Sequence, residues 1–238
     1  MDMTISGSGT IGAGEYNKIR ISGSGRSEGP VRCESFHCSG AFSGKSDIEC
    51  ANEIHISGAF KNTGTIKAKE FSASGSAKNE AALTADVVKV SGGFKVGGKL
   101  KAVELRVSGG LGVDGDIEAE NARITGGVSC SGLINAEEFY LDTSGSNYSC
   151  AESVGGSKIT VENGRTGGLI EKLFGSRKGC FEVSESIEGD EISLENTRAK
   201  TVTGRSVKIG EGCSIDLVRY TENADVSPKA KVGKLEKI

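Results

Sequence analysis

The sequence is poor in the residues that fill a wide globular core. Its 238 residues include two prolines, no tryptophan, eight phenylalanines and four tyrosines. The shortage of proline and the lack of a three-residue glycine period exclude a collagen triple helix. Because so few large side chains cannot fill a broad interior, the composition predicts a narrow, elongated core.

Long apolar segments are also missing. No stretch approaches the roughly 18 consecutive apolar residues that a transmembrane helix needs. The opening residues, MDMTISGSGT, carry neither the basic start nor the apolar segment of a signal peptide. We therefore expect a cytoplasmic protein, in which the seven cysteines are reduced thiols rather than a disulfide framework.

The chain has no strong excess of charge of either sign. Its formal net charge is −3, and it contains no dense basic block. Surfaces that bind nucleic acid concentrate Lys and Arg on one face, so no nucleic-acid partner is expected. Glycine, in contrast, is abundant at 36 residues and recurs at regular intervals.

A repeat of about 17 residues occupies most of the chain up to Leu141. Copies begin at Ile21, Cys38, Ile56, Ala73, Val90, Val107, Ile124 and Leu141. Seven of them carry a glycine two residues later, at Gly23, Gly40, Gly58, Gly75, Gly92, Gly109 and Gly126. These glycines are expected to supply the positive φ of sharp corners.

Aligned on this period, the apolar residues form four columns and alternate with polar residues. The columns are Val31, Ile48, Ile66, Leu83, Leu100, Ile117, Ile134; Cys33, Cys50, Ala68, Ala85, Ala102, Ala119, Ala136; Phe36, Ile54, Phe71, Val88, Leu105, Ala122, Phe139; and Cys38, Ile56, Ala73, Val90, Val107, Ile124, Leu141. Such alternation is typical of half-buried strands, and copies this short bury their inward side only by stacking. The pattern predicts an all-β protein, a β-solenoid whose coils stack at about 4.8 Å.

Two outward columns are rich in charge. They are Arg32, Glu49, Lys67, Thr84, Lys101, Glu118, Asn135 and His37, His55, Ser72, Lys89, Arg106, Arg123, Tyr140, the second flanked by Glu53, Glu70, Glu104 and Glu138. Opposite charges on adjacent coils predict a solvated ladder of salt bridges. A binding stripe for an acidic partner is the alternative interpretation.

The register loosens after Leu141. We expect coils over residues 1–161, an inserted loop over 162–180 and further coils with a C-terminal cap over 181–238, all in one continuous domain. The last part has a five-residue beat at Ile187, Ile192, Thr197, Val202 and Val207, typical of three-sided coils of about 15 residues. These coils are expected to end near Val218, with Gly210, Gly212, Val226 and Val232 in a cap that protects the last edge.

The residues that could perform chemistry are not arranged for it. Cys33, His37, Cys38, Cys50 and His55 are close in sequence, but the cysteines occupy inward columns and the histidines an outward one, which argues against zinc. Cys33 and Cys50 stack on adjacent coils at a separation that permits a disulfide, although core packing is the favoured interpretation. The histidines have no nucleophile motif nearby. No enzyme activity, cofactor or metal is predicted.

The coils from about Ile5 to Leu141, with a V/I-S/T-G-G opening and an inward I-x-A pair, resemble the bactofilins, bacterial polymer-forming cytoskeletal proteins. The segment IEGDEISLENTRAKTVTGRSVKIGEGCSIDL, Ile187 to Leu217, is similar to the C-terminal half of the longer bactofilin-like proteins of Gram-positive bacteria. The resemblance implies a single-stranded right-handed β-helix that assembles end to end into nonpolar, nucleotide-independent filaments. It also implies a scaffold for cell-shape or envelope proteins, often at the inner face of the membrane.

A stacked coil leaves unpaired backbone groups at each end. The N-terminal coil, with Ile5, Ile11, Ile19 and Ile21, has no charged cap, and we expect it to be the polymerisation end. The predicted function is a non-enzymatic, self-assembling scaffold whose partner is itself, with the membrane surface and an envelope-associated client as further partners. The alternative is a monomeric β-helix that binds or processes carbohydrate.

Large apolar residues leave the columns in RTGGLIEKLFGSRK, residues 165–178. Leu169, Ile170, Leu173 and Phe174 recur at one-turn spacing beside Lys172, Arg177 and Lys178. Apolar residues so placed beside basic ones favour an amphipathic turn on an anionic membrane. Two other interpretations are a cover over the solenoid wall or its last open edge, and a site for a client.

Overall fold

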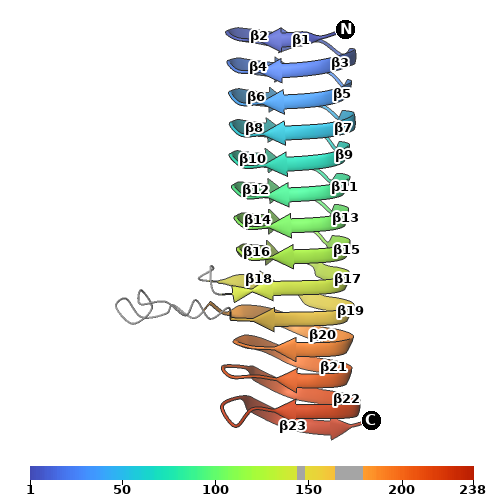
Figure 1. The fold of residues 1–238 in the computed structure, drawn as a ribbon, viewed down its shortest axis with the longest axis vertical. Helices are drawn as coiled ribbons and strands as arrows, with labels where there is room; N and C mark the ends of the chain where they lie inside the picture. The colour runs from blue at the N-terminus through green and yellow to red at the C-terminus, as the bar shows by residue number, and fades with distance from the viewer. Residues whose placement is uncertain (144–147, 164–178) are drawn as a thin grey trace, which may run out of the picture. The chain divides into compact units, whose positions relative to one another are not determined.

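The computed structural model describes residues 1–143, 148–163 and 179–238 (Figure 1). The elements in these ranges are the strands β1 to β23, joined by bends and turns, and the strand pairs are parallel. The chain divides into two compact units, Met1–Glu118 and Ala119–Ile238, and each is described by itself. The predicted all-β class is therefore confirmed.

In the first unit, each coil combines a long strand with a short one. The strands are β1 Met3–Ile5, β2 Ser8–Ile11, β3 Gly14–Ile21, β4 Ser24–Ser27, β5 Val31–Cys38, β6 Ala41–Gly44, β7 Ile48–Ile56, β8 Ala59–Asn62, β9 Ile66–Ala73, β10 Ser76–Asn79, β11 Leu83–Val90, β12 Gly93–Val96, β13 Leu100–Val107 and β14 Gly110–Val113. β15, Ile117–Ile124, begins at the end of this unit. In Figure 1 the long strands stack in one ladder and the short strands in another.

The register within these ladders is regular. Leu83 of β11 pairs with Leu100 of β13, and Ser76 of β10 pairs with Gly93 of β12, so equivalent residues lie 17 positions apart. A bulge between β5 and β7 adds one residue to a single coil, after the Cys33–Cys50 pair. The structure is thus a β-solenoid with coils of about 17 residues, as the repeat predicts.

The predicted inward columns form the core. The residues of the Val31 and Phe36 columns are buried throughout the first unit. Along the short strands, Phe42 stacks on Phe60 with ring centroids 5.3 Å apart. The ring of Phe71, on a long strand, stacks on the ring of Phe94, on a short strand, with centroids 4.8 Å apart. Large side chains therefore fill the lumen from two walls.

The repeated glycines have a different role from the predicted one. Among the described residues, positive φ occurs at Gly14, Gly212 and Asn196, and at none of the corner glycines of the repeat. A Cβ at Gly58 would instead lie 1.9 Å from the backbone oxygen of Gly40 in the preceding coil. Because no side chain fits this close approach, the corner selects glycine by stacking distance rather than by φ. The prediction of positive φ was wrong.

The second unit has longer and less regular coils. Its strands are β16 Gly127–Cys130, β17 Leu133–Asp142, β18 Ser149–Ala151, β19 Ser153–Glu162, β20 Phe181–Leu194, β21 Thr197–Ile209, β22 Ser214–Val226 and β23 Lys231–Lys237. Leu133 pairs with Ser153, 20 positions on, whereas Ile187 pairs with Val202, 15 positions on. The residues of the predicted five-residue beat are all buried, which confirms the interpretation of this segment.

The coils of the second unit continue beyond the predicted end. β22 extends past Val218 to Val226, and Ile215 and Val218 pair with Val232 and Leu235 of β23. Val226 and Val232 therefore lie in strands rather than in a separate cap, which corrects the expected end near Val218. The sequence of β23, KVGKLEK, did not predict a strand, because it is polar and lysine-rich and shows little alternation of apolar and polar residues. Its side chains are only partly buried or exposed.

Candidate functional site

The edge of the first coil has backbone groups available for pairing. β1 pairs with β3, and β2 pairs with β4; among the described residues, no strand pairs with the opposite side of either. In parallel ladders, successive residues direct their N–H and C=O groups to opposite neighbours. The Ile5 oxygen accepts from the Ser22 N–H and the Gly7 oxygen from the Ser24 N–H. The backbone groups of Thr4 and Thr10 consequently face the open side.

The structure places the four predicted isoleucines inside the lumen. Ile11 and Ile19 are fully buried, Ile21 is 1% exposed and Ile5 is 6% exposed. Ile19 and Ile21 belong to β3, which pairs with both β1 and β5. These side chains stabilise the terminal coils, whereas the edge itself consists of the backbone of β1 and β2. Their role in polymerisation stays a prediction.

Tyr16 is a residue of this end that the repeat analysis overlooked. It pairs with Cys33 and so occupies the inward column that later coils fill with cysteine or alanine. Its ring is almost buried, and its hydroxyl donates to the Gly12 oxygen at 3.0 Å. Extending the cysteine and alanine column back by one coil would have found it. Within the described structure, the pairing of β1 with β3 begins at Ile19, so the Tyr16 ring covers a corner of the lumen that β1 does not reach.

The strands at the two ends of the chain differ in charge. β1 and β2 read MTI and SGTI, without charge or proline. β23 reads KVGKLEK and pairs, in the described structure, with β22 alone. Its Glu236 carboxylate lies 3.3 Å from Arg219 Nε and also contacts Lys234. Because lysine on an edge strand opposes the addition of another strand, the edge of β1 and β2 is the better site for pairing.

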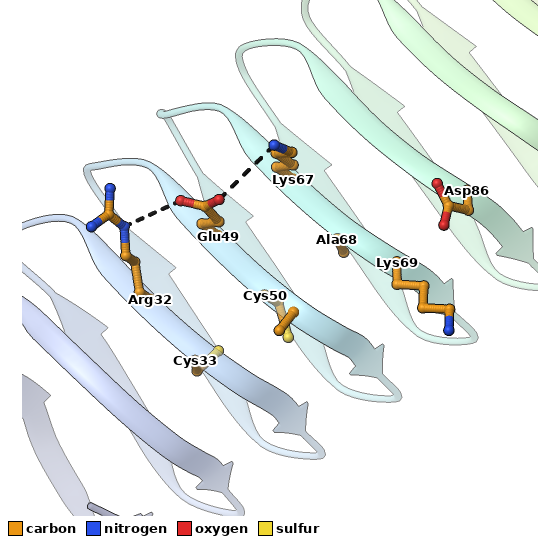
Figure 2. Close-up of a pocket in the computed structure, with 9 residues that line it drawn as sticks. Arg32, Cys33, Glu49, Cys50, Lys67, Ala68, Lys69 and Asp86 are labelled. Carbon is orange, nitrogen blue, oxygen red and sulfur yellow. Dashed lines mark hydrogen bonds and ion pairs between the residues drawn. The ribbon is translucent and has the colours of Figure 1, made fainter.

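A second candidate site is a cavity of about 560 Å³ on the long-strand wall (Figure 2). Its lining residues are Arg32, Cys33, Glu49, Cys50, Ala51, Lys67, Ala68, Lys69 and Asp86. Glu49 bridges two cations, with an oxygen 3.2 Å from Arg32 Nε and another 4.0 Å from Lys67 Nζ. The cavity thus combines a charged rim with two thiols.

The two thiols are close enough to influence one another. Contact with Cys50, together with burial, raises the pKa of Cys33 far above its ordinary value. The same contact lowers the pKa of Cys50, and backbone N–H groups of Asn52 and Glu53 contribute to this shift. Cys50 Sγ also lies 3.3 Å from the backbone oxygen of Glu34 and 3.1 Å from that of Glu53, two alternative acceptors for its single thiol hydrogen. Cys50 is therefore the more acidic thiol of the pair.

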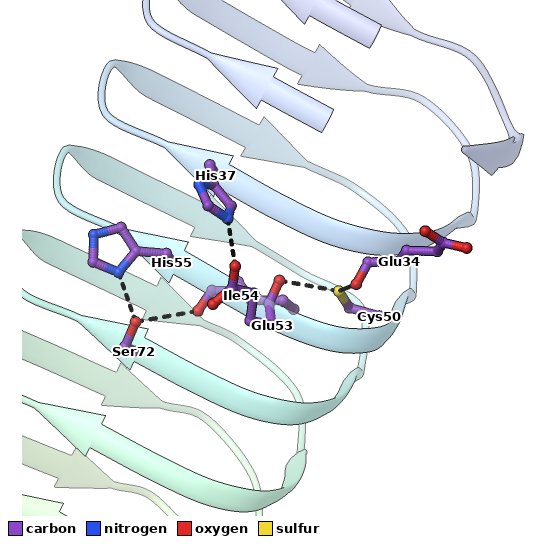
Figure 3. A network of polar contacts seen from close by, with 7 residues as sticks. All are labelled: Glu34, His37, Cys50, Glu53, Ile54, His55 and Ser72. Atoms are coloured by element: carbon purple, nitrogen blue, oxygen red, sulfur yellow. Dashed lines mark hydrogen bonds and ion pairs between the residues drawn. The ribbon is translucent and has the colours of Figure 1, made fainter. Parts of the chain in front are cut away.

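The histidines lie on the outer surface (Figure 3). His37 Nε2 is 2.9 Å from Glu53 Oε1, and His55 Nδ1 is 2.8 Å from Ser72 Oγ. Lys89 and Glu70 form an ion pair at 2.8 Å further along the same column. The charged column is therefore a solvated ladder, as predicted. His37 and Cys50 contact opposite ends of one residue, since the histidine lies against the Glu53 carboxylate and the thiol against the Glu53 backbone oxygen.

The remaining predicted site lies outside the described residues. Leu169, Ile170, Lys172, Leu173, Phe174, Arg177 and Lys178 all fall within 164–178, which the structure does not describe. Their contact with a membrane, the solenoid wall or a client stays a prediction. Within the described ranges, there is no helix long and apolar enough to span a membrane.

Comparison with known proteins identifies similarity to two proteins of Bacillus subtilis (strain 168), both named as uncharacterized. The chain is 34% identical to YhbF over 90 residues, which cover 38% of this chain and 35% of YhbF. It is 49% identical to YhbE over 49 residues, or 21% of each protein. The matches thus span about a third and a fifth of these relatives. No family model matches the chain, and no solved structure matches it.

Proposed function

We propose that the protein is a non-enzymatic, self-assembling scaffold of the bactofilin type, which forms filaments without nucleotide. The observation that supports this proposal most directly is the uncharged, proline-free edge of β1 and β2, where parallel pairing occurs on one side in the described structure. A second copy can satisfy these backbone groups by continuing the stack. The regular coils of the first unit offer parallel ladders that such stacking would extend.

Each added subunit would form main-chain hydrogen bonds and cover the end of the lumen. Ile5, Ile11 and Tyr16 already lie at this end with most of their surface buried. The free subunit therefore exposes little apolar surface at this end before a second copy binds. Affinity would come mainly from the ladder and from water excluded at the lumen end.

Proline substitutions at the open side test the proposal. Thr4→Pro and Thr10→Pro remove N–H groups that face away from the chain's own ladder, and edge strands tolerate proline at such positions. We expect the wild-type chain to sediment as polymers with or without nucleotide, and the double variant to sediment as monomers or dimers. Electron microscopy should show filaments for the wild type alone.

The matched control is the Thr4→Ala, Thr10→Ala variant, which keeps both N–H groups and should polymerise like the wild type. Circular dichroism of the proline variant checks that its β structure is intact. A wild type that stays monomeric across concentration and salt would contradict the scaffold function. Filaments formed equally well by the proline variant would contradict the assignment of the edge.

A further inference from the structure

Cys33 and Cys50 face one another across adjacent coils. They are direct partners in the parallel pairing of β5 with β7. Neighbouring parallel strands lie about 4.8 Å apart, which falls within the Cα separation that disulfides span. Both side chains point inward, and they are 6% and 3% exposed. Their position, rather than simple proximity in sequence, brings the two sulfur atoms together.

A local irregularity follows the pair. The register between β5 and β7 shifts after Cys33 and Cys50, because β7 contains one residue more than β5 at this corner. Disulfides prefer Cβ atoms somewhat closer than an undistorted parallel ladder places them. A bulge beside the pair interrupts the ladder, so the backbone can close this small gap without displacing the regular strands.

The cavity gives this buried pair a route to small molecules. Both cysteines line it, and its volume of about 560 Å³ is large enough for a small organic molecule (Figure 2). Three cations, Arg32, Lys67 and Lys69, and two carboxylates, Glu49 and Asp86, share its lining. The rim therefore carries one net positive charge and favours an acidic molecule over a basic one.

We infer that Cys33 and Cys50 form a redox modification site, which an acidic low-molecular-weight disulfide oxidises to a bond between the two coils. The site is independent of polymer formation. Cys38 illustrates the contrast within the same strand, because it is also buried but pairs with Ile56 rather than with a second thiol.

The reaction proceeds in two balanced exchanges. The Cys50 thiolate, the more acidic of the pair, attacks one sulfur of the small disulfide, forming a mixed disulfide and releasing one small thiolate. Cys33 then loses its proton and attacks Cys50 Sγ, which releases the second small thiolate. The protein dithiol is oxidised by two electrons, and the small disulfide is reduced to two thiols.

Formation of the bond would fasten the fourth coil to the third, close to the first strands of the chain. A crosslink between residues far apart in sequence restricts the unfolded chain and stabilises the folded one. Oxidation should therefore raise the midpoint of thermal unfolding, and reduction should return it to the original value.

Peptide mapping of the folded chain tests the site. The protein is incubated with the acidic disulfide dithiodiglycolate and digested with trypsin under non-reducing conditions. Cleavage after Arg32, Lys45 and Lys61 gives separate peptides for Cys33 and Cys50, although Cys33 and Cys38 share one. We expect the two peptides to become linked, with a mass about 2 Da below their sum, since two hydrogens are lost.

Single alanine variants assign the bond. Cys33→Ala and Cys50→Ala should abolish the linked pair, and both should fold because the same column contains Ala68, Ala85 and Ala102. Cys38→Ala should retain the link and the rise in unfolding midpoint. A link that persists in Cys33→Ala, that needs denaturant to form, or that fails to form in the wild type would overturn the proposal.

The choice of oxidant provides a second test. Dithiodiglycolate should react faster than the cationic cystamine, and the difference should shrink as salt is added, because salt screens the charged rim. The exposed Arg32→Ser variant should reduce the preference while leaving the link itself intact. Equal rates for the two reagents at low salt would overturn the assignment of an acidic oxidant.

Discussion

The coils of residues 1–118 and those of residues 119–238 turn their corners differently. In the first unit, a stack of corner glycines separates a long strand from a four-residue strand, and a Cβ at these glycines would lie about 2 Å from the preceding coil. In the second unit, Leu194 pairs with Val161 and so continues the column of Leu141. The corner position two residues later belongs to Asn196, which has a φ of 46°.

The difference shows two ways to build the same corner. Where two coils approach as closely as Gly58 and Gly40, each copy needs glycine, because no Cβ fits. Where Asn196 takes the position, its left-handed backbone makes the turn, and the register of this unit varies from 15 to 20 residues. A strict glycine period therefore reports close corner stacking, and its loss reports a corner with another backbone conformation.

The largest expected effect is the loss of a ring from the regular unit. Phe71→Ala removes a fully buried side chain that stacks on Phe94. We expect it to lower the free energy of unfolding by about 3–5 kcal/mol, because a cavity remains between fixed coils. Ile192→Val in the second unit should cost only about 0.5–1.5 kcal/mol. Urea denaturation measures both, and equal losses would contradict the larger cavity expected at Phe71.

Alanine at a corner glycine tests whether the close approach of two coils requires glycine there. Gly58→Ala should destabilise the first unit by about 1–3 kcal/mol, since its Cβ would meet the Gly40 oxygen and force the coils apart. Gly93→Ala is the control, because its Cβ would have no neighbour within 4 Å. Thermal melts of the two variants should separate clearly. Matching melting temperatures would refute the role of stacking distance.

A buried polar ladder offers a further comparison within the first unit. Asn62 Nδ2 donates to Asn79 Oδ1 at 3.1 Å inside the lumen, and the same column continues as Val96 and Val113. Asn79→Val should cost about 1–3 kcal/mol, because it leaves the Asn62 amide with one partner fewer.

The double variant Asn62→Val, Asn79→Val removes both polar groups and should be less destabilised than the single one. Urea denaturation of the single and double variants provides the measurement. A double variant whose stability loss equals the sum of two separate losses would show that the amides do not act as a pair.

The smallest expected effect depends on pH. The side-chain and backbone donors of Thr65 lower the pKa of the exposed Asp47 carboxyl. Because the folded-state pKa is below the unfolded one, the contribution of Asp47 is present above the ordinary carboxyl pKa of about 4 and is lost as pH falls through the lowered pKa.

Asp47→Asn should therefore reduce the urea midpoint slightly at neutral pH, and the gap should close in acid. A gap that widened on acidification would have the opposite sign and would contradict this account. Thr65→Val removes the hydroxyl donor but keeps the backbone N–H, so it should reproduce only part of the effect.

The repeat predicted the core of this protein well, because successive coils place the same kind of residue at equivalent positions. The apolar columns beginning at Val31 and Phe36, and the charged ladder beside them, could be predicted from spacing alone. The end at Val218 could not, because the strand β23 is polar where its inward side is only partly covered. The sequence predicted that four isoleucine side chains form the polymerisation end. In the structure these side chains are buried, and the groups at the edge of β1 and β2 are backbone N–H and C=O groups.

Sequence by itself determined the solenoid, since coils of this length have no core unless they stack. It also determined which residues face inward, through the two-residue alternation. Only the tertiary structure decided why the corner glycines are required, because a contact between successive coils cannot be read from one coil. It likewise decided that Cys33 and Cys50 share a cavity, since the bulge that follows them and the charged rim around them arise from four adjacent coils packed together.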